Sequence, residues 1–160
     1  MRAFGETMLK QTHTVLVVDD EPSSLLLLER VLRPSYNVIT SRSGAEALEV
    51  LKAEEISLLI TDQRMPGISG TELLREGQVL RPGMVSMLLT SNKDSETFID
   101  AIMNSGAIRV INKPWEAANL LSLVETSLQM YENFLERKGS IERLKQTSHN
   151  LDKIVNTPRR

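Results

Sequence analysis

Residues whose side chains could handle a phosphoryl group follow short apolar runs at regular intervals along this chain. There are two acids after the first run, one acid after the third, a hydroxyl after the fourth and a lysine after the fifth, namely Asp19, Asp20, Asp62, Thr90 and Lys113. Three carboxylates gathered in one crevice repel one another, and they stay ionised only if a cation shares the site. Oxygen ligands without nearby histidine or cysteine indicate a hard cation, and Mg²⁺ is the usual one where phosphate is handled.

A metal-bound carboxylate that faces a lysine and a hydroxyl has the groups that phosphoryl transfer requires. The carboxylate can act as the nucleophile and form an acyl phosphate. Mg²⁺ and the lysine can neutralise the phosphoryl oxygens, and the hydroxyl can hydrogen-bond the attached group. Each residue alone has a commoner structural explanation, because acids cap helices, threonine favours strands and Lys-Pro pairs occur in turns. Only their combination at successive strand ends predicts a site.

The apolar runs predict five strands, at 14–18, 37–40, 58–61, 85–89 and 108–111. Helical spacing of apolar residues predicts a helix after each strand. The first two of these helices are predicted from Pro22 through Leu32 and at 44–53, where Ser43 is the cap. The third contains Leu73 and Leu80, the fourth spans 94–104, and the fifth begins at Trp115. Strict alternation with short connections implies an α/β fold, a doubly wound five-stranded parallel sheet with helices on both faces. Ligands of such sheets bind at the carboxyl ends of the strands, where the candidate site residues stand.

The last helix is longer than a domain of this size needs. One apolar stripe contains Leu121, Val124, Leu128, Tyr131 and Leu135, and a neighbouring stripe contains Leu120, Leu123, Met130 and Phe134. The first stripe can cover the sheet, so the second needs another partner. Its heptad spacing resumes at Ile141, Leu144, Leu151 and Val155. Gly139 predicts a kink or break between the two parts, because glycine costs about 1 kcal/mol in a helix.

Composition excludes several classes of protein. The chain has 160 residues and a net charge of −2, so no overall field draws it to nucleic acid or to an anionic membrane. It has no cysteine, which excludes disulfides and thiolate metal sites and fits a cytoplasmic location. No apolar run approaches the roughly 20 residues of a membrane span. We therefore expect no membrane and no direct nucleic-acid contact.

Four motifs resemble the receiver domain of bacterial two-component response regulators. They are VLVVDDEP at 15–22, ITDQRMPGISG at 60–70, LLTS at 88–91 and INKPW at 111–115. The resemblance implies the flavodoxin-like strand order 2-1-3-4-5. It divides the chain into a flexible arm at 1–11, a receiver domain at 12–137 and a helical extension or linker at 138–160.

The resemblance also implies a role for each site residue. Asp62 resembles the phosphoacceptor. Asp20 resembles a direct Mg²⁺ ligand, Asp19 a ligand that acts through water, and the main-chain carbonyl of Arg64 a further ligand. Mg²⁺ is the only cofactor implied.

Two more positions resemble parts of the receiver switch, and one departs from it. Thr90 resembles the hydroxyl residue that moves toward the phosphoryl group, and Lys113 the lysine that pairs with it, with a cis bond to Pro114. Many receivers have an aromatic residue three positions before this lysine, where this chain has Val110. That departure predicts a weaker or different relay. The tryptophan directly after Pro114, Trp115, resembles the pattern of receivers joined to signalling output domains.

The resemblance implies a phosphoacceptor signalling domain that catalyses only its own phosphorylation and dephosphorylation, and is not otherwise an enzyme. Its donor would be a sensor histidine kinase or a phosphotransfer protein. Phosphorylation would switch the surface made by the fourth helix, the fifth strand and the last helix. The chain could also be a fragment of a larger signalling protein, such as an effector enzyme or a hybrid kinase.

Three interpretations of the tail stay open: a homodimer interface on the last helix, a link to an effector domain, and phosphotransfer chemistry at His149. An exposed helical histidine is the simpler explanation of His149, and His13 is expected to meet solvent in the N-terminal arm. A phosphatase of the haloacid dehalogenase type is a remote alternative. It would need a second aspartate two positions after the first, where Asp19 is followed by Asp20 and Glu21.

Overall fold

The computed structural model describes residues 13–91 and 109–156. Five parallel strands form one sheet in the order β2-β1-β3-β4-β5, as predicted. The strands are β1 (Thr14–Val18), β2 (Asn37–Ser41), β3 (Leu58–Asp62), β4 (Val85–Ser91) and β5 (Arg109–Lys113). The described helices are α2 (Pro22–Leu32), α3 (Gly44–Ala53), α4 (Gly70–Leu80) and α6 (Ala117–Val155). The N-terminal arm and the helix predicted at 94–104 lie outside the described residues.

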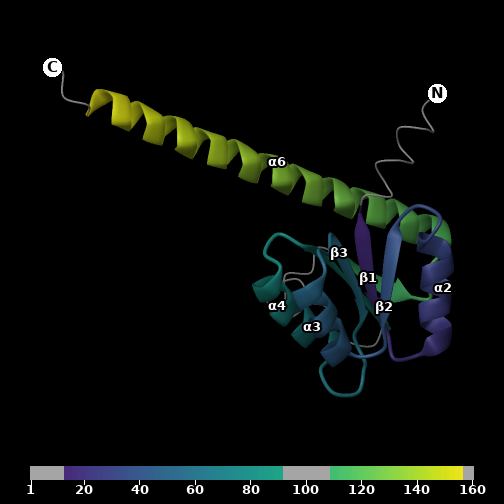
Figure 1. Ribbon diagram of the computed structural model, residues 1–160. Coiled ribbons are helices and arrows are strands. Elements are labelled where there is room, and N and C mark those ends of the chain that lie inside the picture. The colour runs from purple at the N-terminus through teal and green to yellow at the C-terminus, as the bar shows by residue number, and fades with distance from the viewer. Residues whose placement is uncertain (1–12, 92–108, 157–160) are drawn as a thin grey trace.

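Helices cover both faces of the sheet (Figure 1): α2 and the first part of α6 lie on one side, and α3 and α4 on the other. Successive side chains of β1 enter the two hydrophobic clusters in turn. Val15 and Val17 pack toward α2 and α6, whereas Leu16 and Val18 pack toward α3 and α4. All four are fully or almost fully buried, which explains why this strand is apolar at every position.

Polar side chains fix where two helices begin. Ser43 accepts a hydrogen bond from the backbone N–H of Glu46 at 3.1 Å, so the predicted cap of α3 is confirmed. Ser69 and Glu72 form a reciprocal capping box at the start of α4. These caps set the ends of the loops that leave β2 and β3.

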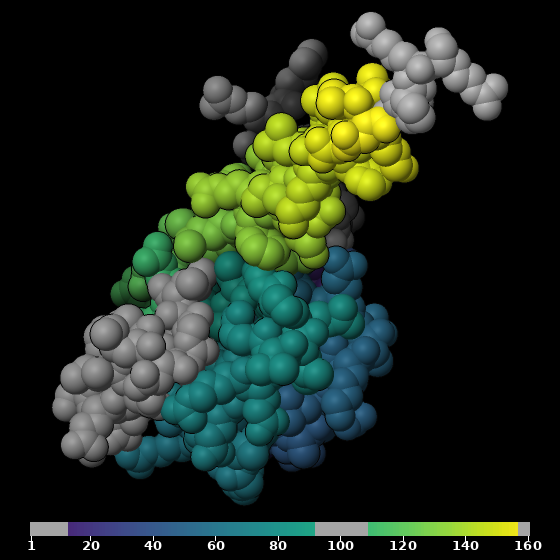
Figure 2. Space-filling model, turned by 90° about the vertical axis from the view of Figure 1, so that its left-hand side faces the viewer, coloured from purple at the N-terminus to yellow at the C-terminus, as the bar shows by residue number. Residues whose placement is uncertain are grey.

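Helix α6 runs without a break for 39 residues from Ala117, two positions after the predicted start at Trp115. The predicted kink or break at Gly139 is wrong, because the helix continues through it. The cost of one glycine, about 1 kcal/mol, is small beside the good helix formers on both sides. The first part of α6 packs on the sheet, and the part after Leu135 extends past the domain (Figures 1 and 2).

His13 is buried, so the expectation that it meets solvent is wrong. Its Nδ1 lies 3.1 Å from Ser57 Oγ, and its Nε2 lies 2.8 Å from Glu132 Oε1. The ring also meets Tyr131 edge-on, with the ring centroids 5.9 Å apart. His13 immediately precedes β1, so it stands at the amino edge of the sheet where α6 crosses. A contact between residues so distant in sequence leaves no local pattern.

Candidate functional site

Three aspartates meet at the carboxyl edge of the sheet. Val18 pairs with Thr61 in adjacent strands, so the residues that follow them, Asp19 and Asp62, emerge side by side. One carboxylate oxygen each from Asp19, Asp20 and Asp62 lies within 4.8 Å of the others. Asp19 is 1% exposed and Asp62 is 8% exposed, so these two carboxylates are largely shielded from water, whereas Asp20 is partly exposed.

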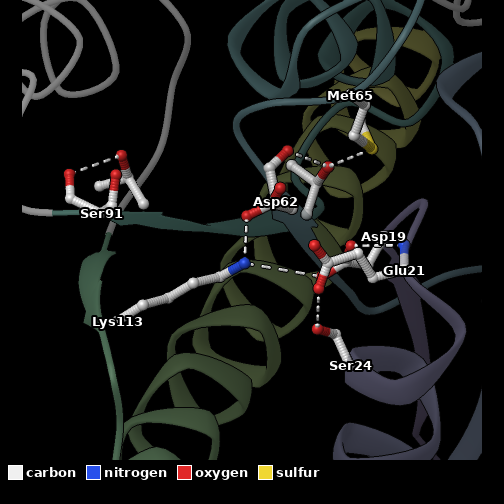
Figure 3. A network of polar contacts seen from close by, with 9 residues as sticks. Asp19, Glu21, Ser24, Asp62, Met65, Ser91 and Lys113 are labelled. Atoms are coloured by element: carbon white, nitrogen blue, oxygen red, sulfur yellow. Dashed lines mark hydrogen bonds and ion pairs between the residues drawn. The ribbon is translucent and has the colours of Figure 1, made fainter.

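Lys113 reaches into this acidic group from the end of β5 (Figure 3). Its Nζ lies 2.6 Å from Asp62 Oδ1 and 3.7 Å from Asp19 Oδ2. Burial is the largest single effect and lowers the pKa of Lys113. The hydrogen bond and charge of Asp62, together with the charge of Asp19, raise the pKa by more in sum, so it lies above its ordinary value. The lysine is therefore a cation at neutral pH.

Asp19 has an environment that suits a bound cation. Burial is the largest effect and raises its pKa, and the charges of Asp62 and Asp20 raise it too. The backbone N–H of Glu21 donates to Asp19 Oδ1 at 3.0 Å and lowers the pKa, as does Lys113. The other oxygen, Oδ2, is buried without a hydrogen-bond partner in the described structure. A buried carboxylate oxygen that accepts no hydrogen bond, beside two more carboxylates, fits a Mg²⁺ ion by charge and ligand type.

A pocket of about 220 Å³ opens over the acidic group. Its lining includes every predicted site residue except Asp19, namely Asp20, Asp62, Arg64, Thr90 and Lys113, together with Glu21, Gln63 and Ser91, which were not predicted. Thr90 is buried, and its hydroxyl donates to the carbonyl oxygen of Ser91 at 3.3 Å. The structure thus brings the predicted acids, lysine, hydroxyl residue and Arg64 to one place.

The loop after Asp62 is held by contacts that sequence reasoning missed. The backbone N–H of Gly70 donates to the main-chain carbonyl oxygen of Gln63 at 3.0 Å. The backbone N–H of Thr71 donates to the side-chain oxygen of Gln63, Oε1, at 2.9 Å. Gly70 has no room for a side chain, because a Cβ there would lie 2.4 Å from the carbonyl oxygen of Asp62. The glycine was visible in the sequence, but nothing local indicated that Gln63 bridges the loop.

A second pocket, of about 380 Å³, lies beside the first and was not predicted. It is lined by Asp19, Ser24, Leu27, Leu28, Leu89, Lys113, Pro114 and Trp115. The predicted cis bond between Lys113 and Pro114 is confirmed. Val110 is half-buried against the cluster under α3 and α4. Trp115, the only tryptophan, lines this second pocket with Asp19 and Lys113, so it stands close enough to report on events at the site.

A family model described as the response regulator receiver domain matches residues 15–125. The chain belongs to this family. The receiver domain resembles the hydrogenase transcriptional regulatory protein HoxA of Bradyrhizobium diazoefficiens, with 33% identity over 146 residues. That match covers 91% of this chain but 30% of HoxA, so the chain spans about a third of the length of such curated relatives.

Solved structures with this fold agree. A chain described as an adenylate cyclase from Rhodopirellula baltica superposes with a TM-score of 0.78 and 30% identity, over 81% of this chain and 97% of that one. A CheY-like receiver domain from Methanospirillum hungatei JF-1 gives 0.72 and 30%, over 76% and 97%. These matches favour a receiver domain over the haloacid dehalogenase alternative. They are also consistent with this receiver domain being part of a larger regulator.

Proposed function

We propose that this receiver domain accepts a phosphoryl group on Asp62 in a Mg²⁺-dependent reaction. The observation that carries the proposal is the contact between Lys113 Nζ and Asp62 Oδ1, 2.6 Å long, inside a group of three aspartates whose charge needs a cation. Asp19 and Asp20 would hold that cation together with Asp62 and the main-chain carbonyl of Arg64. Bound Mg²⁺ would supply positive charge to the phosphoryl oxygens.

The chain's own residues account for the rest of the reaction. A carboxylate oxygen of Asp62 attacks the phosphorus atom, and the bond from phosphorus to the donor's imidazole nitrogen breaks, with the electron pair leaving on that nitrogen. Lys113 then shifts its hydrogen bond from the carboxylate to a phosphoryl oxygen. Thr90 exchanges its bond to the Ser91 carbonyl for one to the phosphoryl group. The domain acts as a phosphoacceptor and not as an enzyme on a separate substrate.

The donor would be the phosphohistidine of a sensor histidine kinase or of a phosphotransfer protein. We further propose that α6 is the output element, because it joins the domain to an exposed helical face on which a second copy could dock. No helix among the described residues is long and apolar enough to cross a membrane.

The test is intact-mass spectrometry after incubation with a small phosphodonor and Mg²⁺. The parent chain should gain one phosphoryl group that hydroxylamine removes, as expected for an acyl phosphate, and EDTA should prevent the gain. Asp62→Asn should gain nothing, whereas Asp152→Asn, an exposed acid on α6, should behave like the parent. Labelling that persists in Asp62→Asn would show that the acceptor is another residue.

A further inference from the structure

Helix α6 has two apolar faces, and the domain covers only one of them. The buried positions are Leu120, Val124, Ser127, Leu128 and Tyr131. The other face is exposed and extends beyond the domain: Met130, Phe134, Ile141, Leu144, Leu151 and Val155 are 39–79% exposed. At 3.6 residues per turn, the centres of the two faces point about 115° apart. Beyond Phe134, whose ring packs on Gly83, the domain leaves the second face open, because the C-terminal part of α6 extends past the domain (Figure 2).

The exposed residues follow a seven-residue repeat. Phe134, Ile141 and Val155 occupy the first position of the heptad, with Ser148 as its one polar member, and Leu144 and Leu151 occupy the fourth, with Arg137 as its one polar member. A sustained seven-residue repeat keeps its apolar seam toward a partner only if two helices supercoil around each other. A second copy of this chain has the same repeat over the same length, about 30 Å for the 20 residues after Leu135.

The residue types favour one arrangement of the two copies. Within the free part of the helix, the apolar residues at the first position are β-branched Ile141 and Val155, on either side of Ser148, and those at the fourth are Leu144 and Leu151, after Arg137. This combination favours parallel, two-stranded coiled coils.

The flanking charges agree with a parallel arrangement. In a parallel pair, Ser140 would face the partner's Lys145, and Thr147 would face the partner's Asp152, so these flanking positions oppose no like charges, and the one like-charged pair is Arg137 with its own copy at the domain end of the seam. An antiparallel pair would instead bring together the edges that hold Lys138, Lys145 and Asp152, with the two copies of Lys145 near the middle.

We propose that two copies of this chain pair through the exposed face of α6 as a parallel two-stranded coiled coil, with Ile141, Leu144, Leu151 and Val155 in its seam. Both receiver domains then lie at one end of the coil, and both C-terminal ends leave together at the other. This inference rests on the proposed role of α6 as the output element, but it does not require that Asp62 be phosphorylated.

Cysteine cross-linking tests the direction of the pair cleanly, because the chain has no cysteine of its own. Arg137→Cys and Leu151→Cys place one thiol at either end of the seam. A parallel pair predicts that each variant alone forms a disulfide-linked dimer under mild oxidation. Gln146→Cys, on the opposite face of the helix, is the matched control and should stay monomeric on a denaturing gel. Cross-links that form only when the two variants are mixed would overturn the parallel arrangement.

Light scattering tests the interface itself. The parent should have twice the 18.0 kDa mass of one chain, and Ile141→Asp with Leu144→Asp should return it to the single-chain mass. Val79→Asp replaces an exposed apolar residue on α4, away from α6, and should leave the dimer intact. A parent of single-chain mass would overturn the proposal. Asp62→Asn should cross-link like the parent, so failure of the interface and failure of the phosphoacceptor assignment give different results.

Discussion

At the carboxyl edge of the sheet, a buried oxygen of Asp19 has no hydrogen-bond partner in the described structure, whereas at the amino edge both ring nitrogens of His13 have one. Both edges bury ionisable groups against neighbouring elements. At the carboxyl edge, three like charges share one place and one lysine. At the amino edge, His13 is matched to a hydroxyl and a single acid. The carboxyl edge therefore has more negative than positive charge, which suits a cation, whereas the contacts at the amino edge hold α6 against the sheet.

The largest expected effect is at the carboxyl edge. Lys113→Ala should slow phosphorylation of Asp62 by a small donor about 100-fold, because one fixed charge no longer stabilises the phosphoryl oxygens. Mg²⁺ binding, followed by Trp115 fluorescence, should remain. Time courses of intact mass measure the rate, with Lys52→Ala, an exposed lysine on α3, as the control. An unchanged rate would show that the contact between Lys113 and Asp62 has no part in the reaction.

The amino edge should respond in stability and not in phosphorylation. His13→Ala leaves Ser57 and Glu132 without their partner and should lower the free energy of unfolding by about 1–3 kcal/mol. Urea denaturation measures this change. His149→Ala removes the only other histidine, from an exposed position on α6, and should change little. If the two histidine variants lose the same stability, the contacts of His13 with Ser57 and Glu132 contribute nothing to it.

Asp19→Asn should change stability in the opposite direction. Without Mg²⁺, it removes a buried charge that lies beside two other acids, so the free energy of unfolding should rise on the order of 1 kcal/mol. Added Mg²⁺ should then stabilise the variant less than the parent. Urea denaturation in EDTA and in Mg²⁺ gives both values. A loss of stability in EDTA would mean that the charge of Asp19 is well compensated by the protein alone.

The smallest effect expected is that of Tyr131→Phe at the amino edge. The hydroxyl of Tyr131 donates to Glu55 Oε1 at 3.5 Å, a long hydrogen bond, and the ring would remain beside His13. The free energy of unfolding should fall by less than about 0.5 kcal/mol. A loss as large as that of His13→Ala would show that the hydroxyl of Tyr131 contributes as much as His13 to holding α6 in place.

The two edges also differ in how far the sequence predicted them. The carboxyl edge was predicted because parallel strands all end there, so Asp19, Asp62 and Lys113 are marked by their place after apolar runs. The amino edge was missed, because His13 and Glu132 meet only through the folded chain, and neither lies in a motif. Gln63 was missed for a similar reason, since its bonds to the start of α4 depend on the shape of a loop. The continuity of α6 through Gly139 depended on its neighbours and not on the glycine.

Phe134 makes one of the last contacts between α6 and the domain, and Gly83 makes that contact possible. A Cβ on Gly83 would lie 2.1 Å from the ring, so the aromatic side chain occupies the space that any other residue would fill. About 30 Å of unbroken helix lies beyond this point. For a rigid lever of that length, a tilt of about 10° at the fulcrum moves the far tip by about 5 Å. If α6 tilts about the contact between Phe134 and Gly83, small rotations there become ångström-scale displacements at the far end of the helix.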